Sequence, residues 1–382
     1  MIKKILIVFG TRPEAIKMAP VYLALKKEPD NFDVSLCVTA QHREMLDQVL
    51  GVFDIIPDYD LDIMKAGQDL FDVTAKTLIL FRDVLKEVNP HIVMVHGDTT
   101  TTFAAATACF YSGIKVWHVE AGLRTFDIHA PFPEEFNRQI VSKVADIHLA
   151  PTVSARDNLL KEGTDEGRVI VTGNTVIDSL FFVLERIESC KVRDQKVSNI
   201  LNQYLSFSWK LDRFVLITGH RRENFGEGFK NICRALAKLA RRYPEIQFVY
   251  PVHLNPNVQA PVSELLTNID NMHLIQPLDY EPFAYLLKYS YLIVTDSGGI
   301  QEEAPSLGKP VVVLRDSTER PEAVIAGTVV LSGSSEKKII AHVSELLDDQ
   351  NKYNAMAISH NPYGDGKACE KIVQALRISK CS

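Results

Sequence analysis

The stretch Leu6-Ile-Val-Phe-Gly-Thr-Arg12 has a counterpart in the second half of the chain, Val215-Leu-Ile-Thr-Gly-His-Arg221. Each is a short apolar run that leads into a glycine and then an arginine. Continuous apolar runs of this length suit parallel strands that are covered on both faces. The recurrence indicates that a strand-and-loop pattern starts twice along the chain.

Outward from these two stretches, Val- and Ile-rich runs alternate with helical patterns along the whole sequence. The expected strands are residues 4–9, 33–39, 92–96, 115–119, 147–150, 169–172, 214–218, 247–251, 273–275, 291–295, 311–314 and 328–331. The expected helices include residues 15–27, 68–88, 101–112 and 229–242. This alternation predicts an α/β fold with two doubly wound parallel-sheet domains. The boundary is expected within residues 185–212, a charged segment without a strand.

Length and composition limit the class of protein. With 382 residues, 46% of them hydrophobic, the chain can bury more than one core. A formal net charge of −6 argues against a general nucleic-acid-binding surface. Six scattered cysteines indicate reduced thiols, and no apolar stretch reaches the roughly 18 residues of a membrane span. We expect a soluble cytoplasmic protein, because the apolar start is also too short for a signal peptide.

Three acidic residues lie just beyond apolar runs: Asp98, Glu120 and Glu134. The carboxyl ends of parallel strands face the ligand crevice, where carboxylates can transfer protons. Each acid also has a structural alternative to weigh. Asp98 could cap a helix, and Glu134, like Glu135, could be a first-turn acid. Glu120 precedes no helix start, and the convergence of the three favours an enzyme.

Two loops have the features of anion sites. Gly10-Thr-Arg-Pro-Glu-Ala-Ile-Lys17 places Arg12 and Lys17 near a helix N-terminus, where anions bind readily. In the second half, Ser297-Gly-Gly299 follows a strand and opens a helix expected over residues 300–306. Its two glycines allow close backbone approach to phosphates.

Two further positions in the second half accompany this phosphate loop. Glu303 could accept hydrogen bonds from ribose hydroxyls. The alternative is that Glu302 and Glu303 both lie on an ordinary exposed helix surface. His220 occupies a strand-end loop beside Arg221 and Arg222, where it could bind phosphate or transfer protons, although a lone histidine is usually structural.

The sequence offers no pattern for a metal or cofactor. The histidines lack ligand spacings, and no HExxH motif occurs. There is also no G-x-S-x-G elbow or paired Cys/His nucleophile. No metal and no cofactor are expected.

At these motifs the chain closely resembles the non-hydrolysing UDP-N-acetylglucosamine 2-epimerases of bacteria, almost from end to end. The resemblance implies a GT-B-like fold, in which two Rossmann-like doubly wound parallel-sheet domains face a deep cleft. Residues 1–175 would form the first domain, with the C-terminal helix of residues 365–382 packing back on it, and residues 176–364 the UDP-binding second. The matching stretches are Phe9-Gly-Thr-Arg-Pro-Glu-Ala-Ile-Lys-Met-Ala-Pro20, Thr39-Ala-Gln-His-Arg-Glu-Met-Leu-Asp-Gln-Val49, His96-Gly-Asp-Thr-Thr-Thr-Thr102, His118-Val-Glu-Ala-Gly-Leu-Arg124, Pro133-Glu-Glu135, Thr172-Gly-Asn-Thr-Val-Ile-Asp178, Gly219-His-Arg-Arg-Glu-Asn224, Thr295-Asp-Ser-Gly-Gly-Ile-Gln-Glu-Glu-Ala-Pro-Ser-Leu-Gly-Lys-Pro310 and Thr318-Glu-Arg-Pro-Glu-Ala323.

The resemblance also implies roles for single residues. One departure is Leu278, where some members carry Gln for uracil contact. The family's catalytic positions match Asp98, Glu120, Glu134 and His220; its basic substrate contacts match Arg12 and Lys17; and its nucleotide-binding positions match Phe283, Ser297, Gly298, Gly299, Glu303 and Arg320.

Two kinds of partner follow from the same resemblance. Some members bind a second UDP-N-acetylglucosamine as an allosteric activator, and Gln41, His42 and Arg43 fit that pattern, although Glu44 stands where certain members have Gln. A homodimer is expected as well, with neither nucleic acid nor membrane as a partner.

The implied reaction is reversible C2 epimerisation of UDP-N-acetylglucosamine to UDP-N-acetylmannosamine. UDP would be eliminated to give 2-acetamidoglucal and then re-added, supplying precursors for cell-surface polysaccharide such as capsule. The alternatives are a hydrolysing epimerase that releases UDP and N-acetylmannosamine, a GT-B glycosyltransferase, and a non-catalytic UDP-sugar sensor.

Overall fold

The computed structural model describes residues 2–40, 43–65 and 67–379. They form two compact units, the described residues of Met1–Phe182 with Tyr363–Ser382, and Val183–Pro362. Each unit is a parallel sheet with helices on both faces, so the predicted α/β, GT-B-like fold is confirmed. No described helix is both long and apolar enough to cross a membrane.

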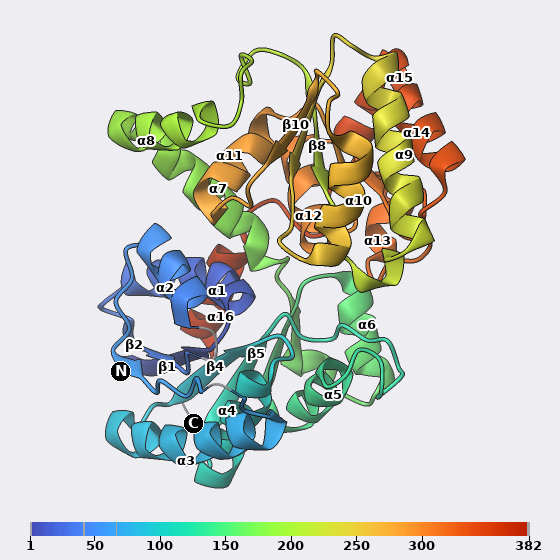
Figure 1. Cartoon of the computed structure of the whole chain (residues 1–382). Coiled ribbons are helices and arrows are strands. Elements are labelled where there is room, and N and C mark those ends of the chain that lie inside the picture. The colour runs from blue at the N-terminus through green and yellow to red at the C-terminus, as the bar shows by residue number, and fades with distance from the viewer. Residues whose placement is uncertain (1, 41–42, 66, 380–382) are drawn as a thin grey trace. The chain divides into compact units, whose positions relative to one another are not determined.

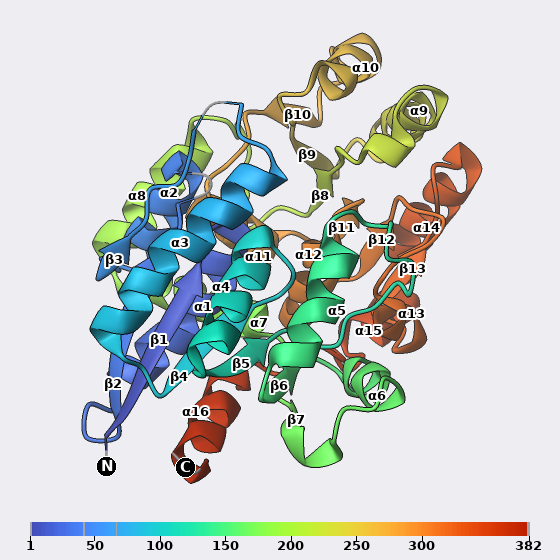
Figure 2. The same ribbon diagram turned by 90° about the horizontal axis from the view of Figure 1, so that it is seen from below.

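The first unit contains a seven-stranded parallel sheet in the order β3-β2-β1-β4-β5-β6-β7. Helices α1, α2 and α16 cover one face, and α3, α4 and α5 cover the other (Figures 1 and 2). The strands are β1 (Lys3–Phe9), β2 (Phe32–Val38), β3 (Tyr59–Asp60), β4 (Ile92–His96), β5 (Lys115–Val119), β6 (Ile147–Ala150) and β7 (Val169–Val171). The helices are α1 (Arg12–Lys26), α2 (Arg43–Val52), α3 (Leu70–Val88), α4 (Thr100–Ser112), α5 (Glu134–Val144), α6 (Val153–Lys161), the 3-10 turn η1 (Glu166–Arg168), α16 (Ala368–Ile378) and the first half of α7 (Thr175–Ser189), whose second half belongs to the other unit.

The second unit contains a six-stranded parallel sheet in the order β10-β9-β8-β11-β12-β13. Helices α9, α10 and α14 form a layer on one face, and α11 packs with α8 (Figure 1). The strands are β8 (Phe214–Thr218), β9 (Gln247–Pro251), β10 (Met272–Ile275), β11 (Leu292–Thr295), β12 (Val311–Val313) and β13 (Val329–Leu331). The helices are α8 (Lys191–Asn202), η2 (Arg222–Asn224), α9 (Glu227–Arg242), α10 (Pro256–Leu266), α11 (Tyr280–Tyr289), α12 (Gly298–Glu303), η3 (Ala304–Leu307), α13 (Pro321–Ile325), α14 (Glu336–Asp348) and α15 (Gln350–Ala357).

Burial explains why the apolar runs become central strands. Every residue of β4 and of β11 is buried, as expected for parallel strands between two helix layers. In each sheet the strand order reverses direction next to the first strand, β1 or β8. Ligands bind beyond the carboxyl ends of the strands at such a reversal. This edge holds the loops that carry most of the predicted site residues.

The C-terminal helix α16 packs against α1 of the first unit. At its start, the Asp178 carboxylate accepts hydrogen bonds from the backbone N–H groups of Ala368 (3.2 Å) and Cys369 (2.8 Å). At its end, the buried Lys3 ammonium donates to the carbonyls of Leu376, Arg377 and Ser379. A carboxylate at the N-terminus and a cation at the C-terminus both complement the helix dipole.

The structure departs from the predicted elements at three places. The two-residue strand β3 was missed, because Tyr59–Asp60 carries no apolar run. The segment 185–212 lacks a strand, as predicted, but it is largely helical through the end of α7 and α8. The helix predicted over residues 300–306 begins earlier, at Gly298, and continues as the 3-10 turn Ala304–Leu307.

Candidate functional site

Two of the three candidate acids follow neighbouring strands of the first sheet. Asp98 lies two residues beyond β4, and Glu120 directly follows β5. These strands pair in parallel, with His96 opposite Val119. Both acids therefore lie at the same carboxyl edge of the sheet. Glu134 begins helix α5, which packs against α4.

Glu120 is the centre of a small charged cluster. Its Oε2 pairs with the Lys17 ammonium and accepts a hydrogen bond from Nε2 of His96 at 3.0 Å. Burial by itself raises the pKa of Glu120, but the adjacent Lys17 and His96 outweigh burial and hold the pKa well below its ordinary range. Its backbone also has a φ of 60°, a left-handed conformation that is uncommon outside glycine. Backbone strain of this kind is concentrated at functional sites.

Asp98 is held by a helix on the other side of its loop. Its Oδ2 pairs with the guanidinium of Arg138, and its carbonyl accepts a hydrogen bond from Nδ2 of Asn137 at 2.9 Å. The N-cap of α4 is Thr99, whose hydroxyl accepts from the N–H of Thr102 at 3.2 Å. Asp98 therefore does not cap the helix, and its carboxylate pairs with Arg138 instead.

Glu134 and Glu135 are adjacent but differ in environment. Glu135 is fully buried, and its carboxylate accepts hydrogen bonds from the N–H groups of Thr125 (3.1 Å) and Phe126 (3.2 Å) and from Arg138 and Gln139. Oε2 of Glu134, in contrast, is buried without a hydrogen-bond partner among the described residues. A buried acceptor without a partner is costly. Glu135 therefore holds the preceding loop, whereas Glu134 has capacity to bind a ligand group.

Glu14 is a buried carboxylate that the sequence did not single out as a site residue. Its Oε2 accepts from the N–H groups of Gly10 (3.0 Å) and Thr11 (2.8 Å) and from the Thr11 hydroxyl (2.8 Å). Its Oε1 accepts from the hydroxyls of Thr99 (2.7 Å) and Thr102 (3.1 Å). Glu14 thus ties the β1–α1 loop to the β4–α4 loop that carries Asp98. Thr11-x-x-Glu14 is a capping-box spacing, which indicates the contact with Thr11 but not the contacts with Thr99 and Thr102.

Two histidines at the same edge are held by nearby acceptors. Nε2 of His118 donates to the carbonyl of Gly97 at 2.7 Å, and burial lowers the pKa of His118 to about 3. His118 is therefore neutral at physiological pH. Nε2 of His96 donates to Glu120, which fixes the proton on that nitrogen. Neither histidine was predicted as a site residue, because a buried histidine has no distinguishing local pattern.

Arg12 and Lys17 both lie on α1, Arg12 at its first residue. Lys17 reaches Glu120, as described above. Arg43, at the start of α2, pairs with Asp47 (3.1 Å), Asp60 (2.5 Å) and Asp62 (3.4 Å). The two other candidates for an activator site, Gln41 and His42, lie outside the described residues.

In the second unit, the predicted phosphate loop follows β11. Ser297 is the N-cap of α12, and its N–H donates to the Thr295 hydroxyl at 2.9 Å. The Arg320 guanidinium lies against Gly298, where an added Cβ would be only 2.4 Å from Nη1. Arg320 also pairs with Glu302 (2.7 Å) and Glu319 (2.7 Å). The loop therefore brings backbone N–H groups and a guanidinium together, a combination suited to phosphate.

Glu302 and Glu303 are both buried, so the helix-surface alternative is wrong. Glu302 holds Arg320, and Glu303 ends α12. Phe283 lies in α11 and is half-buried. The structure thus places Ser297, Gly298 and Arg320 together, whereas Phe283 sits on a separate helix of the same unit.

His220 lies just beyond β8, next in the sheet to β11. Oδ2 of the buried Asp296 accepts from the N–H groups of His220 and Arg221, both at 2.8 Å. The imidazole stacks on His253 at a centroid distance of 5.0 Å. Burial lowers the pKa of His220, with His253 and Arg221 acting in the same direction and Asp296 opposing them. His220 is therefore predominantly neutral at neutral pH in the ligand-free protein.

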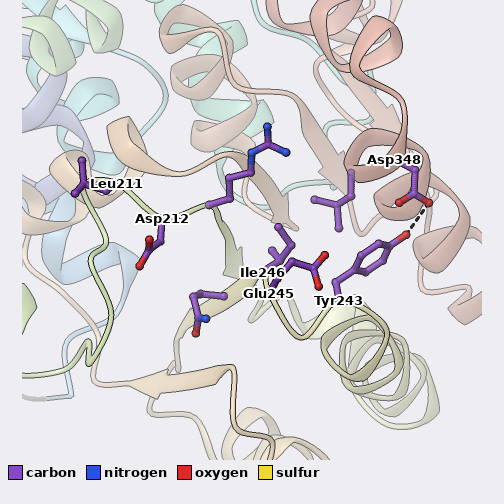
Figure 3. A pocket seen from close by; sticks show the side chains of 9 residues that line it. Leu211, Asp212, Tyr243, Glu245, Ile246 and Asp348 are labelled. Carbon is purple, nitrogen blue, oxygen red and sulfur yellow. Dashed lines mark hydrogen bonds between the residues drawn. The ribbon is translucent and has the colours of Figure 1, made fainter.

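A hollow of about 540 Å³ lies elsewhere in the second unit (Figure 3). Its lining includes Arg213 and Ile246, which precede β8 and β9, and Tyr243, whose hydroxyl donates to Asp348 at 2.8 Å. The hollow therefore lies at the amino ends of β8 and β9, and the carboxyl end of β8 leads to His220. Among the described residues, no group of three or more His, Cys, Asp or Glu side chains could hold a metal ion.

Comparison with known proteins adds a consistent set of relatives. The family model described as UDP-N-acetylglucosamine 2-epimerase matches residues 23–377. The UDP-N-acetylglucosamine 2-epimerase of Campylobacter jejuni is 57% identical over 98% of each chain, and that of Escherichia coli K12 is 53% identical over 99% of this chain and 100% of its own. The crystal structure of UDP-GlcNAc 2-epimerase from Neisseria meningitidis bound to UDP-GlcNAc superposes with a TM-score of 0.88 at 51% identity, covering 98% of this chain and 99% of that one.

Proposed function

The chain belongs to the UDP-N-acetylglucosamine 2-epimerase family, and from this premise we propose how it inverts C2 of its substrate. The enzyme interconverts UDP-N-acetylglucosamine and UDP-N-acetylmannosamine without net hydrolysis. UDP leaves from C1, C2 loses its proton to give 2-acetamidoglucal, and a proton and UDP are then re-added. The product would serve as a precursor of cell-surface polysaccharide.

The chemistry of the sugar explains why elimination must accompany deprotonation. The C2–H bond is not adjacent to a carbonyl, so a carbanion at C2 lacks resonance stabilisation. Departure of UDP creates oxocarbenium-like character at C1, which acidifies the proton at C2. A catalyst therefore needs groups that stabilise the leaving diphosphate and acid–base groups that reach both faces of C2.

The first unit supplies the acid–base groups in this proposal. Glu120 is kept ionised by Lys17 and His96, which suits a base. Asp98 is paired with Arg138, and Glu134 has a buried carboxylate oxygen without a partner among the described residues. The three carboxylates therefore differ in the number and charge of the groups that contact them. This difference is the observation that carries the proposal, because removing a proton from one face of C2 and delivering one to the other requires separate groups in different environments.

The second unit supplies the groups for UDP. Ser297, Gly298 and Gly299 would present backbone N–H groups to the diphosphate, with Arg320 beside them. His220 would stabilise or protonate the departing UDP. Phe283 and Glu303 would contact the nucleoside, and Arg12 of the first unit would contact the diphosphate or sugar. This division of roles follows from the local chemistry of each unit and from the family membership.

One experiment tests the reaction. UDP-N-acetylglucosamine is incubated with the protein in D2O and followed by NMR. Deuterium at C2 with UDP still attached is expected, because the proton removed from C2 exchanges with solvent before re-addition. Release of free N-acetylmannosamine would mean hydrolysis, and an unchanged spectrum would favour a transferase or a sensor.

A homodimer would use the exposed face of α3 and α4. These adjacent helices expose Phe71, Phe110 and Tyr111 by 84%, 63% and 78%. Large aromatic side chains exposed on adjacent helices are typical of protein–protein contact surfaces. We expect sedimentation velocity to show a dimer, and Phe110→Glu combined with Tyr111→Lys to convert it to a monomer. A monomeric wild-type protein would contradict this expectation.

Activation by a second UDP-N-acetylglucosamine is proposed at the start of α2, where Arg43 lies. Three carboxylates surround Arg43, so an anionic ligand would have to compete with them for the guanidinium. The reaction started from UDP-N-acetylmannosamine alone should then show a lag that added UDP-N-acetylglucosamine abolishes. Simple saturation without a lag would exclude such activation.

A further inference from the structure

Asp296 is a buried carboxylate whose two oxygens are used differently. Oδ2 accepts hydrogen bonds from the backbone N–H groups of His220 and Arg221 and so anchors the β8–α9 loop. Oδ1 is buried and has no hydrogen-bond partner among the described residues. The polar atom that faces it is Nδ1 of His220, at 3.8 Å. Leaving a carboxylate oxygen buried and unpaired costs free energy that a hydrogen bond would recover.

The gap between Asp296 and His220 is small. A hydrogen bond between nitrogen and oxygen spans roughly 2.7–3.2 Å, so closing this pair needs a movement of under about 1 Å. The His220 side chain is 45% exposed and can rotate, whereas Asp296 is fixed by its backbone contacts. The stacked partner His253 is itself oriented, because its Nδ1 accepts from the N–H of Asn255 at 3.1 Å.

We propose that Asp296 is a positioning residue whose Oδ1 accepts a hydrogen bond from Nδ1 of His220 in the working enzyme. This contact places the proton of the neutral imidazole on Nδ1 and leaves Nε2 to face the leaving diphosphate. It also stabilises the imidazolium that forms when His220 takes up a proton. The inference rests on the proposed role of His220 in UDP departure. It does not depend on the acid–base set of the first unit.

A direct test is the tautomer of His220 in the wild-type protein. With 15N-labelled histidine, and the His220 signals assigned from their loss in His220→Asn, we expect the neutral ring to carry its proton on Nδ1. In Asp296→Asn the amide can donate to Nδ1, so the proton should move to Nε2. A wild-type ring protonated on Nε2 overturns the inference, even if Asp296→Asn fails to fold.

The pH dependence provides a second readout. The titratable and charged groups that face His220 are Asp296, His253 and Arg221. Asp296 favours the protonated ring, so Asp296→Asn should shift the His220 titration, and the alkaline limb of kcat/KM that follows it, to lower pH. Tyr250→Phe is the matched control, because the Tyr250 hydroxyl holds the same loop through the Gly219 carbonyl at 2.8 Å without contacting the imidazole. This variant should lower stability but leave the tautomer and titration unchanged.

A double-mutant cycle separates the two possible failures. Asp296→Asn and His220→Asn should each lower kcat on the order of 10²-fold, the usual effect of a positioned acid–base group. The double variant should be no slower than His220→Asn within about twofold, because the two residues act as one unit. If the losses of kcat in the two single variants multiply in the double variant, Asp296 does not act through His220. The proposed role of His220 itself would still stand. Normal turnover in His220→Asn overturns the proposed role of His220 and the inference that rests on it.

Discussion

At the scale of single residues, neighbouring side chains of the same type have opposite roles. Glu135 is enclosed by four hydrogen-bond donors and holds the loop before α5, whereas Glu134 presents a buried oxygen without a described partner. The difference follows from helix geometry, because adjacent residues project about 100° apart around a helix axis. Glu135 thus turns toward the loop and Arg138.

Substitution of these two glutamates should separate stability from catalysis. Glu135→Gln should destabilise the protein by roughly 1–3 kcal/mol, because the neutral amide leaves buried donors unsatisfied. Glu134→Gln should lower kcat by about 10²–10⁴-fold with nearly unchanged stability. Thermal unfolding and steady-state kinetics of both variants test this. The opposite pattern would exchange the two assignments.

A second prediction at this scale concerns pH. Folding lowers the pKa of Glu120. Its ionised carboxylate therefore stabilises the folded protein at pH values above the pKa of a glutamate in the unfolded chain, roughly 4.3. This stabilisation is lost as the pH falls below that pKa toward the pKa of the folded state. The stability difference between wild type and Glu120→Gln, measured by urea unfolding, should therefore shrink on acidification. The exposed Glu166→Gln is the control, and a pH-independent difference for Glu120→Gln would refute the assignment.

At the scale of elements, α12 shows why a short helix needs a glycine at one position. The Arg320 guanidinium occupies the space beside Gly298, whereas an added Cβ at Gly299 would meet no described atom within 4 Å. Both positions are helical, so alanine gains up to about 1 kcal/mol of helix propensity at either. The two glycines therefore differ in packing and not in backbone preference.

Alanine substitutions should report this difference. Gly299→Ala should keep or raise the melting temperature of the ligand-free protein. Gly298→Ala must displace Arg320, so it should be less stable than Gly299→Ala and should bind UDP more weakly than wild type by calorimetry. Equal stability and unchanged UDP affinity in Gly298→Ala would show that Arg320 moves without consequence.

At the scale of the whole molecule, the chain leaves the first unit within α7 and returns to it at Tyr363. The returning helix α16 is fixed at both ends by residues far away in the sequence, Asp178 and Lys3. The last helix of the first unit therefore comes after the whole second unit in the sequence. Stability of the first unit should depend on these terminal contacts.

Lys3→Met tests that dependence. Loss of the ammonium leaves the last carbonyls of α16 without their donor, at a cost of roughly 1.5–3 kcal/mol. Amide hydrogen exchange should then accelerate in α16 more than in the second unit. The adjacent exposed Lys4→Met is the matched control, and equal exchange in the two variants would count against the contact.

Much of the fold followed from local sequence. The central strands β4, β5, β8 and β9 lie within the predicted bounds, because each is a short, mainly apolar segment. The two-residue β3 was missed, since so short a strand forms only where β2 is present to pair with it. The acids at strand ends were also predictable, because strand order places them at one edge.

The sequence by itself therefore determined two parallel α/β units, the acids Asp98 and Glu120 at the strand ends, and the glycine loop before α12. Only the tertiary structure decided which buried side chains hold those groups. Glu14 meets Thr99, and Asp296 meets His220, across 85 and 76 residues of sequence. Such contacts depend on strands that become neighbours after folding, so no local pattern of residues encodes them.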